Sequence, residues 1–216
     1  MVSGQAGISG GGNSTVITQS TQKAVINWQD FSVAAGGTVQ FAQPNTQSIT
    51  LNRVIGSGGS VIDGTLSANG QVWIINPNGV LFGKGSQVHV GGLLATTADI
   101  TDSDFVAGQN NFAGGTGAGV VNDGTIRTTG GGSVVLSAAG VANNGLIQAD
   151  AGSVVLGGAT AFTLDFAGDN LLRYAVTESG APTGGAEVAN SGRIAAAGGV
   201  KGGRILGQWG GVKTGH

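Results

Sequence analysis

A repeat of about 20 residues runs through this chain and limits what it can fold into. Residues 121–126 read Val-Asn-Asp-Gly-Thr-Ile, and a Ser-Val-Val-Leu run follows at 133–136. Residues 142–147 read Ala-Asn-Asn-Gly-Leu-Ile, and a second Ser-Val-Val-Leu run follows 20 residues after the first. A third copy lies at 189–194 and 203–206, and an earlier one at 62–66 and 71–75. Such spacing is typical of solenoid proteins.

The short apolar runs and the Gly or Asn turns of each repeat predict a β-solenoid, in which one coil supplies two or three strands. Strands of successive coils pair in parallel about 4.8 Å apart, and parallel crossovers are overwhelmingly right-handed. We therefore predict an all-β fold, a right-handed parallel β-helix. Its inward-facing ladders contain Val134, Leu136, Val154 and Leu156. Its corners stack Asn122, Asn143 and Asn190, each followed by a Gly that permits positive φ.

Antiparallel hairpins are the alternative architecture, because Asn-Gly and Asp-Gly are strong hairpin-turn signals. Hairpins, however, do not require similar residues at one phase of a long period. The phase is kept over distance, since Asp63 and Asp123 lie 60 residues, about three periods, apart. The repeat therefore favours the solenoid.

Interruptions of the repeat define the organisation of the chain, which we interpret as one domain. The irregular start is predicted to be a cap, because an exposed coil end needs protection against edge pairing. Two stretches without alternation are predicted to be β excursions, such as hairpins packed on the side of the helix. The end has no cap signal, which fits either a frayed end or, as we expect, a solenoid cut from a longer chain. The predicted segments of residues 1–216 are a cap at 1–40, first coils at 41–96, an excursion at 97–118, regular coils at 119–159, an excursion at 160–186 and last coils at 187–216.

Composition excludes several classes of function. Cysteine is absent, which excludes disulfides, zinc thiolate sites and thiol nucleophiles. The nine Lys and Arg residues are scattered singly, so no basic stripe for nucleic acid is present. Apolar runs reach only about five residues, whereas a membrane-spanning helix needs about 20. The first four residues lack the pattern of a signal peptide, which indicates a mature or engineered start if the protein is exported.

The two histidines and one Gly-rich stretch are weak candidates for chemistry. His89 alternates with two valines, so it is predicted to lie on the solvent side of a strand, and His216 is the last residue. Residues 79–86 resemble a phosphate-binding loop but have the wrong spacing and no Ser or Thr after Lys84. Neither feature predicts a catalytic or nucleotide site.

The acidic residues also argue against an active site. Asp99, Asp102 and Asp104 lack the spacing of a calcium loop and are predicted to be a solvated stretch. Parallel β-helices do host polysaccharide lyases and hydrolases, which need clustered carboxylates. Asp63 and Asp123 share a phase, but three coils would separate them by about 14 Å, more than the roughly 5–10 Å of glycosidases. We predict no catalytic residue, no metal site and no cofactor.

Three stretches carry a resemblance to a known family. They contain, in turn, Asn27, Trp28 and Phe31; Asn52, Arg53 and Val54; and the run Asn76, Pro77, Asn78, Gly79 and Val80. Together they resemble the filamentous-haemagglutinin-type two-partner secretion (TPS) domain of large bacterial exoproteins and adhesins. The family signature Asn-Pro-Asn-Gly-Ile has Val in place of Ile here. A second signature, Asn-Pro-Asn-Leu, is matched only by the degenerate Gln43, Pro44, Asn45 and Thr46, which suggests the branch of the family that lacks it.

The run at 76–79 is a predicted turn, because Pro77 fixes one φ and Asn78-Gly79 readily takes a left-handed conformation. It would end the apolar strand at 72–75 and begin another at Val80. One interpretation is that the turn only shapes a corner of a coil. The other is that it belongs to the signal recognised by a transporter, and the two roles are compatible.

The resemblance implies a secretion-directing domain whose partner is an outer-membrane β-barrel transporter with POTRA domains. The chain would cross the periplasm unfolded and fold outside as a monomer, so that the product is secreted or held at the cell surface. The rest of the exoprotein would supply any host-cell or bacterial-surface receptor binding. The alternative is an adhesive receptor- or glycan-binding module that uses Phe105, Phe112 and Tyr174, although packing on the helix also explains these aromatics. A polysaccharide lyase or hydrolase is less favoured.

Overall fold

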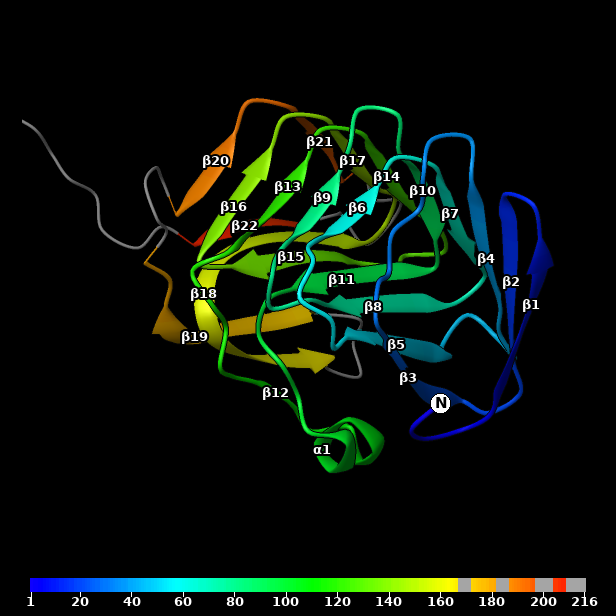
Figure 1. Ribbon diagram of the computed structural model, residues 1–216. Helices are drawn as coiled ribbons and strands as arrows, with labels where there is room; N and C mark the ends of the chain where they lie inside the picture. The colour runs from blue at the N-terminus through cyan, green and yellow to red at the C-terminus, as the bar shows by residue number, and fades with distance from the viewer. Residues whose placement is uncertain (167–171, 182–186, 197–203, 209–216) are drawn as a thin grey trace, which may run out of the picture.

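The computed structural model describes residues 1–166, 172–181, 187–196 and 204–208. Three β-sheets form the faces of a solenoid that winds around one axis (Figure 1). We name the nine-stranded sheet A, the eight-stranded sheet B and the five-stranded sheet C. From the second coil onward the chain passes from sheet B to sheet A to sheet C, and the coils make about six turns.

The strands of each sheet follow the order of the coils. Sheet B contains β1 (Ala6–Gly11), β2 (Ser14–Gln19), β4 (Thr38–Ala42), β7 (Thr65–Ala68), β10 (Gln87–Val90), β14 (Thr125–Thr128), β17 (Leu146–Ala149) and β21 (Arg193–Ala195). Sheet A contains β3 (Lys23–Trp28), β5 (Ile49–Val54), β8 (Gln71–Ile75), β11 (Gly92–Thr96), β15 (Val134–Ala138), β18 (Ser153–Phe166) and β22 (Arg204–Gln208), with β12 (Asn110–Phe112) and β19 (Leu172–Ser179) paired to β18. Sheet C contains β6 (Ser60–Ile62), β9 (Val80–Phe82), β13 (Gly119–Asn122), β16 (Gly140–Asn143) and β20 (Val188–Asn190).

Strands of successive coils pair in parallel and in register, which confirms the predicted β-solenoid over the hairpin alternative. Val134 pairs with Val154 and Leu136 with Leu156. We number the coils from the N-terminus by their strands: coil 1 has β2 and β3, coil 2 has β4 to β6, coil 3 has β7 to β9, coil 4 has β10, β11 and β13, coil 5 has β14 to β16, and coil 6 has β17, β18 and β20.

The interior of the solenoid is filled by aliphatic ladders, as the repeat predicted. Val134, Leu136, Val154 and Leu156 are at most 3% exposed and belong to one continuous apolar cluster. Burial of this apolar surface is the main favourable contribution to folding.

The predicted asparagine corner is also present, but the glycines beside it act differently from the prediction. Nδ2 of Asn122 donates to Oδ1 of Asn143 at 2.7 Å, and Nδ2 of Asn143 donates to Oδ1 of Asn190 at 2.7 Å. The glycines two residues after these three Asn do not have φ in the left-handed region. A Cβ added at Gly145 would instead lie 2.1 Å from the carbonyl oxygen of Gly124. Glycine is therefore required here by the close stacking of coils.

Two segments leave the solenoid and cover the outer face of sheet A. The first lies between β11 and β13 and includes a six-residue helix, α1 (Asp102–Ala107), so the expectation of a purely β excursion was wrong here. The hydroxyl of Thr101 accepts from the backbone N–H of Asp104, and Gly108 ends the helix at φ 78°. The second is an antiparallel hairpin of β18 and β19, as expected.

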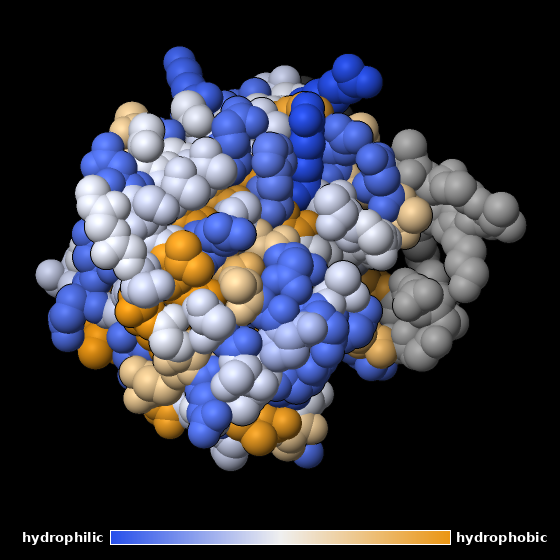
Figure 2. Space-filling view, turned by 90° about the vertical axis from the view of Figure 1, so that its right-hand side faces the viewer, coloured by the Kyte–Doolittle hydropathy of each residue, from blue (hydrophilic) through white to orange (hydrophobic). Residues whose placement is uncertain are grey.

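The N-terminal end carries an antiparallel β1–β2 hairpin at the edge of sheet B. Strand β2 already pairs in parallel with β4, so coiling begins within the range 1–40. Figure 2 looks onto this end and shows apolar surface between polar side chains; Ile8 of β1 is 54% exposed. At the other end, His216 and parts of the predicted ranges 160–186 and 187–216 lie outside the described residues.

Candidate functional site

Residues 76–79 form a tight turn at the corner between β8 and β9, as predicted. The backbone N–H of Gly79 donates to the carbonyl of Asn76 at 3.0 Å, and that of Asn78 donates to Oδ1 of Asn76 at 2.9 Å. Gly79 has φ 97°, a backbone conformation that residues other than glycine rarely adopt. The first Asn therefore acts as an Asx turn, and the Gly closes the corner.

The turn is tied to the coils on both sides of it. Nδ2 of Asn76 donates to the carbonyl of Gly58 and to Oγ of Ser60, both at 3.0 Å in coil 2. The hydroxyl of Thr116, at the end of the first excursion, donates to the carbonyl of Pro77 at 2.5 Å. Asn76 is completely buried and Val80 is 2% exposed, whereas Asn78 is exposed.

Nδ2 of Asn78 is the other amide group of the turn, and it also has a backbone partner. It donates to the carbonyl of Gly56 at 3.0 Å. The side chains of both Asn residues are thus engaged by the folded chain, and the polar groups that define this turn are largely satisfied within the domain.

The degenerate second motif lies at a different corner, between β4 and β5. Gln43 is 7% exposed, and its Nε2 donates to Oγ1 of Thr50 and to the carbonyl of Gln71, both at 3.0 Å. Asn45 exchanges side-chain hydrogen bonds with Gln22 at 3.0 and 2.9 Å. Pro44 and Thr46 are exposed. The two Pro-containing turns are therefore not brought together, because one joins sheet B to sheet A and the other joins sheet A to sheet C.

Most residues of the first two family-matching stretches lie inside coils 1 and 2. Nε1 of Trp28 donates to Oδ1 of Asn52 at 3.0 Å, and Asn52 is completely buried. The rings of Trp28 and Phe31 are 5.4 Å apart, and Val54 is 2% exposed. Oδ1 of Asn27 is buried without a hydrogen-bond partner among the described residues. These residues help to build the first coils.

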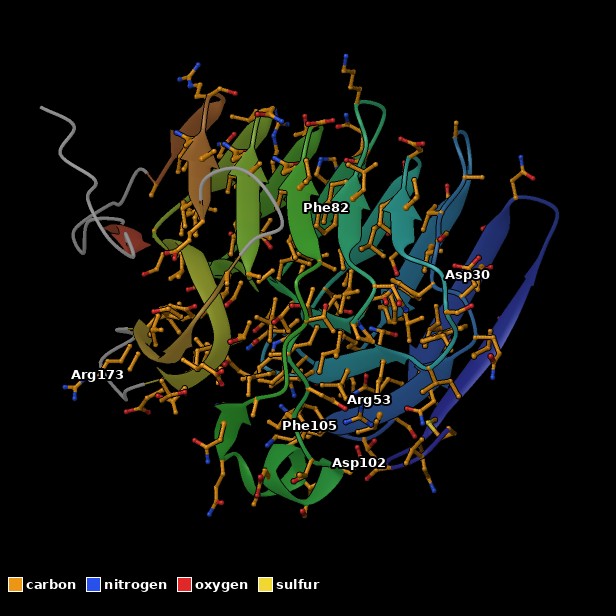
Figure 3. All side chains as sticks on the ribbon, turned by 60° about the vertical axis from the view of Figure 1, so that its left-hand side comes forward. Asp30, Arg53, Phe82, Asp102, Phe105 and Arg173 are labelled. Atoms are coloured by element: carbon orange, nitrogen blue, oxygen red, sulfur yellow. The ribbon has the colours of Figure 1, made fainter. Side chains whose placement is uncertain are left out.

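Arg53 points outward from β5 and holds the first excursion (Figure 3). Its Nε lies 2.8 Å from Oδ1 of Asp99, and its Nη1 lies 2.7 Å from Oδ1 of Asp102. A third donor, Nη2, reaches the carbonyl of Ile100 at 2.6 Å. Burial alone would lower the pKa of Arg53, but the hydrogen bonds and charges of Asp102 and Asp99 outweigh it and raise that pKa.

The ion pairs on Arg53 correct the prediction that these acidic residues are simply solvated. Their side chains remain partly exposed, at 56% for Asp99 and 37% for Asp102. Sequence reasoning missed the pairing because 46 to 49 residues separate the partners. The helix itself had a readable signal, since Thr101, acidic residues in the next turn and Gly108 are ordinary cap and first-turn residues.

The aromatic residues considered for ligand binding are packed in the domain. Phe105 and Phe112 are at most 2% exposed and contact Trp73, with ring centroids 5.5 and 5.8 Å from it. Tyr174 packs on Phe162, and its hydroxyl lies 2.8 Å from Oγ of Ser137. Burial raises the pKa of Tyr174 to about 12, although the Ser137 hydrogen bond opposes the shift. Packing on the solenoid is thus confirmed for these aromatics.

The separation predicted for Asp63 and Asp123 was wrong. The chain pairs β7 with β10 and β10 with β14, so the two residues are two coils apart, about 9.6 Å at the usual strand spacing. The 60-residue interval contains the first excursion, which was counted as a coil. This distance lies close to the carboxylate separation of inverting glycosidases, about 6.5–9.5 Å, so distance alone does not argue against an enzyme.

Other candidates for chemistry take structural positions. His89 is exposed on the outer face of sheet B, as predicted. The range 79–86 contains strand β9, whose Val80 and Phe82 are core residues rather than parts of a phosphate loop. Among the described residues, no group of three or more His, Asp or Glu is placed to hold a metal ion. In the same part of the chain, no helix has the length and apolar character needed to cross a membrane.

Comparison with known proteins gives two sequence relatives, both Heme/hemopexin-binding proteins of Haemophilus influenzae. One, from strain Rd, is 42% identical over 100 residues, which cover 46% of this chain and 11% of the relative. The other is 46% identical over 84 residues, which cover 39% of this chain and 9% of the relative. The chain thus matches only about a tenth of each relative's length.

Two solved structures share the fold. The HMW1 secretion domain of Haemophilus influenzae superposes with a TM-score of 0.80 at 29% identity, covering 95% of this chain and 60% of that one. The filamentous hemagglutinin secretion domain superposes with a TM-score of 0.58 at 20% identity, covering 95% of this chain and 77% of that one.

The family described as TPS secretion domain matches residues 1–206. It is not an enzyme family. Its domains belong to secreted exoproteins and imply a partner transporter in the outer membrane. The chain belongs to the TPS secretion domain family.

Proposed function

We propose that this domain directs the export of its exoprotein through recognition of the unfolded chain by the POTRA domains of the partner barrel. In this mechanism the turn at 76–80 is part of the signal. The chain crosses the periplasm unfolded, passes through the barrel and folds outside, where the β-helix nucleates the folding of the rest of the exoprotein.

The burial and hydrogen bonding of Asn76 carry this proposal. In the folded domain its amide is completely buried and bonded to Gly58, Ser60 and Asn78. A transporter cannot reach these groups once the coil has closed. The same residues are free to be read in an extended chain, so a signal at this turn fits recognition before folding.

Co-expression of the domain with its cognate transporter tests the proposal. Asn78→Ala should reduce the amount of domain in the medium, because it alters the signal at an exposed position of the turn. The matched control is Asn144→Ala, which changes another exposed Asn that precedes a Gly at a coil corner. Both purified variants should refold with β-rich circular dichroism. Normal secretion of Asn78→Ala would show that the turn only shapes a corner.

Binding of heme or hemopexin is not proposed for this domain. The names of the sequence relatives describe proteins of which this chain matches about a tenth. The aromatic side chains suggested for an adhesive module are instead used in packing against Trp73 and Phe162. The secretion function therefore has the better support.

A further inference from the structure

We infer that the first excursion, residues 97–118, is a strap that must dock before coils 1 to 3 become stable. Folding of the part of the chain that carries the candidate signal is then delayed until this later segment has also been exported. The consequence for export rests on the proposed function, whereas the docking requirement concerns folding alone.

The strap belongs to coil 4 but runs back over the three coils that precede it. It leaves β11 at residue 97 and returns to β13, and α1 lies below sheet A near β3 and β5 (Figure 1). Its contacts reach Lys23 in coil 1, Arg53 in coil 2 and Trp73 in coil 3. One segment therefore bridges three successive coils, and its strand β12 also pairs with β18 of coil 6, whereas neighbouring repeats of a solenoid usually contact only each other.

Polar contacts fix both ends of α1 to the early coils. At its start, Arg53 makes the two ion pairs and the backbone hydrogen bond described above. At its end, Nζ of Lys23 donates to the carbonyls of Phe105 and Val106 at 2.7 and 3.2 Å. These carbonyls are among the last of the helix, where the helix dipole attracts cations, and that of Phe105 also accepts from the backbone N–H of Gly108 at 3.1 Å.

The strap also buries apolar side chains that face outward from sheet A. Val25, Leu51 and Trp73 stand on the outer face of coils 1, 2 and 3, and each is at most 2% exposed. Phe105 and Ile100 of the strap belong to the same apolar cluster. Without the strap, Val25 and Leu51 would lose this cover, whereas Trp73 would keep its stacking on Phe166 of β18, with ring centroids 6.3 Å apart.

Docking of the strap also reaches the candidate signal. Thr116, near the end of the strap, bonds the carbonyl of Pro77. A Cβ added at Gly79 would lie 2.9 Å from the carbonyl of Gly119, just beyond the strap. The turn is thus closed from outside by residues that leave the transporter about 40 positions later. The signal stays readable while those residues are still inside.

Hydrogen exchange on the folded 216-residue protein tests the docking requirement without any transporter. The double variant Lys23→Met, Arg53→Met removes the polar contacts of the strap but keeps long apolar stems. We expect amides of β3, β5 and β8 to exchange about tenfold faster or more, since hydrogen bonds to charged groups contribute on that scale. Amides of β14 and β17 in coils 5 and 6 should change little. The matched control is Arg127→Met, an exposed arginine on sheet B.

If only amides of α1 exchange faster and those of β3, β5 and β8 keep their protection, the strap does not stabilise coils 1 to 3 and the inference is wrong. That result would leave the signal at 76–80 untouched. Normal secretion of Asn78→Ala would contradict the proposed signal and would not affect the docking requirement of the strap.

A second variant tests the inference even if the double variant does not fold. Asp99 and Ala113 form an antiparallel bridge with two backbone hydrogen bonds of 2.9 Å, so the strap leaves and returns side by side. Residues 100–112 can therefore be replaced by an Asn-Gly turn. Limited proteolysis should then cut within coils 1 to 3 while β14 and β17 resist; cuts in the β18–β19 hairpin are also expected, because the replacement removes β12, which pairs with β18. Uniform resistance of all coils would overturn the inference.

Discussion

Sheets A and B are built from the same coils, yet their outer faces are opposite in character. The outer face of sheet A is covered by the two excursions, so β8, β11 and β15 are almost wholly buried on both sides. The outer face of sheet B meets solvent, and β10 alternates between buried valines and exposed Gln87 and His89. The excursions, rather than the solenoid, therefore decide which strands are buried on both faces.

The sequence reflects this difference directly. Strands buried on both faces read as continuous apolar runs, and half-buried strands alternate. Val-Trp-Ile-Ile in β8 and Leu-Leu-Ala in β11 are of the first kind, whereas Thr-Ile-Arg-Thr in β14 is of the second. An apolar run in one strand of each coil therefore predicts a covered face.

The largest effect is expected at the centre of the covered face. Trp73→Ala removes the ring on which Phe105 and Phe112 pack and should lower the free energy of unfolding by about 3–5 kcal/mol. Chemical denaturation of the purified domain measures it. A cost under about 1 kcal/mol would mean that the outer face of sheet A behaves like that of sheet B.

Two adjacent leucines sharpen the comparison. Leu93 faces the interior and Leu94 the covered outer face, and both are at most 2% exposed. Leu93→Ala and Leu94→Ala should each cost about 2–5 kcal/mol. Leu146→Ala, on the outer face of sheet B, serves as the matched control and should cost less, because Leu146 is only half-buried. Equal costs for Leu94 and Leu146 in urea unfolding would contradict the distinction.

Alkaline pH should weaken the covered face through Tyr174. The pKa of this phenol is raised to about 12 in the folded domain, against about 10 in an unfolded chain. Between these values the unfolded chain loses the proton and the folded one keeps it. Stability is therefore unaffected below about pH 10 and should fall by up to about 1.4 kcal/mol per pH unit as pH rises towards about 12.

The chain's single tyrosine makes this test clean. Absorbance of the tyrosinate reports its titration in folded protein, and denaturation at several pH values reports stability. Tyr174→Phe should remove this part of the pH dependence. If both proteins lose stability with the same slope, burial of Tyr174 is not the cause.

The smallest effects are expected on the open face. His89 and Arg127 pair in register across β10 and β14, and both are exposed. His89→Ala and Arg127→Ala should each change stability by no more than about 0.5 kcal/mol. A larger loss in thermal unfolding would indicate that something covers sheet B.

Sequence reasoning reached the parts of the fold that repeat. Val134, Leu136, Val154 and Leu156 are predictable as inward-facing because each recurs at one phase, and the residues of a strand alternate between faces. The column of Asn122, Asn143 and Asn190 follows from the same phase. The turn at 76–79 is readable because Pro, Asn and Gly have local conformational preferences that need no tertiary information.

The contacts of the excursions were not predictable by the same route. Arg53 meets Asp99 and Asp102, and Lys23 meets the end of α1, across 46 to 83 residues with no periodicity to connect them. The number of coils between Asp63 and Asp123 could not be obtained by counting periods. The first excursion is about one period long, so it was counted as a coil and the predicted separation was one coil too large. The role of corner glycines such as Gly145 depends on how closely the adjacent coil approaches, which composition does not record.

The asparagine column has a direction. The amide of Asn122 donates to Oδ1 of Asn143, and the amide of Asn143 donates to Oδ1 of Asn190. Amide dipoles aligned in this way polarise one another. Behind Asn122 the same register position is held by Phe82, which offers no polar group. The column therefore can be lengthened only towards the C-terminal side. A growing solenoid templated by such a column would propagate with a single polarity, in the same sense as the chain emerges.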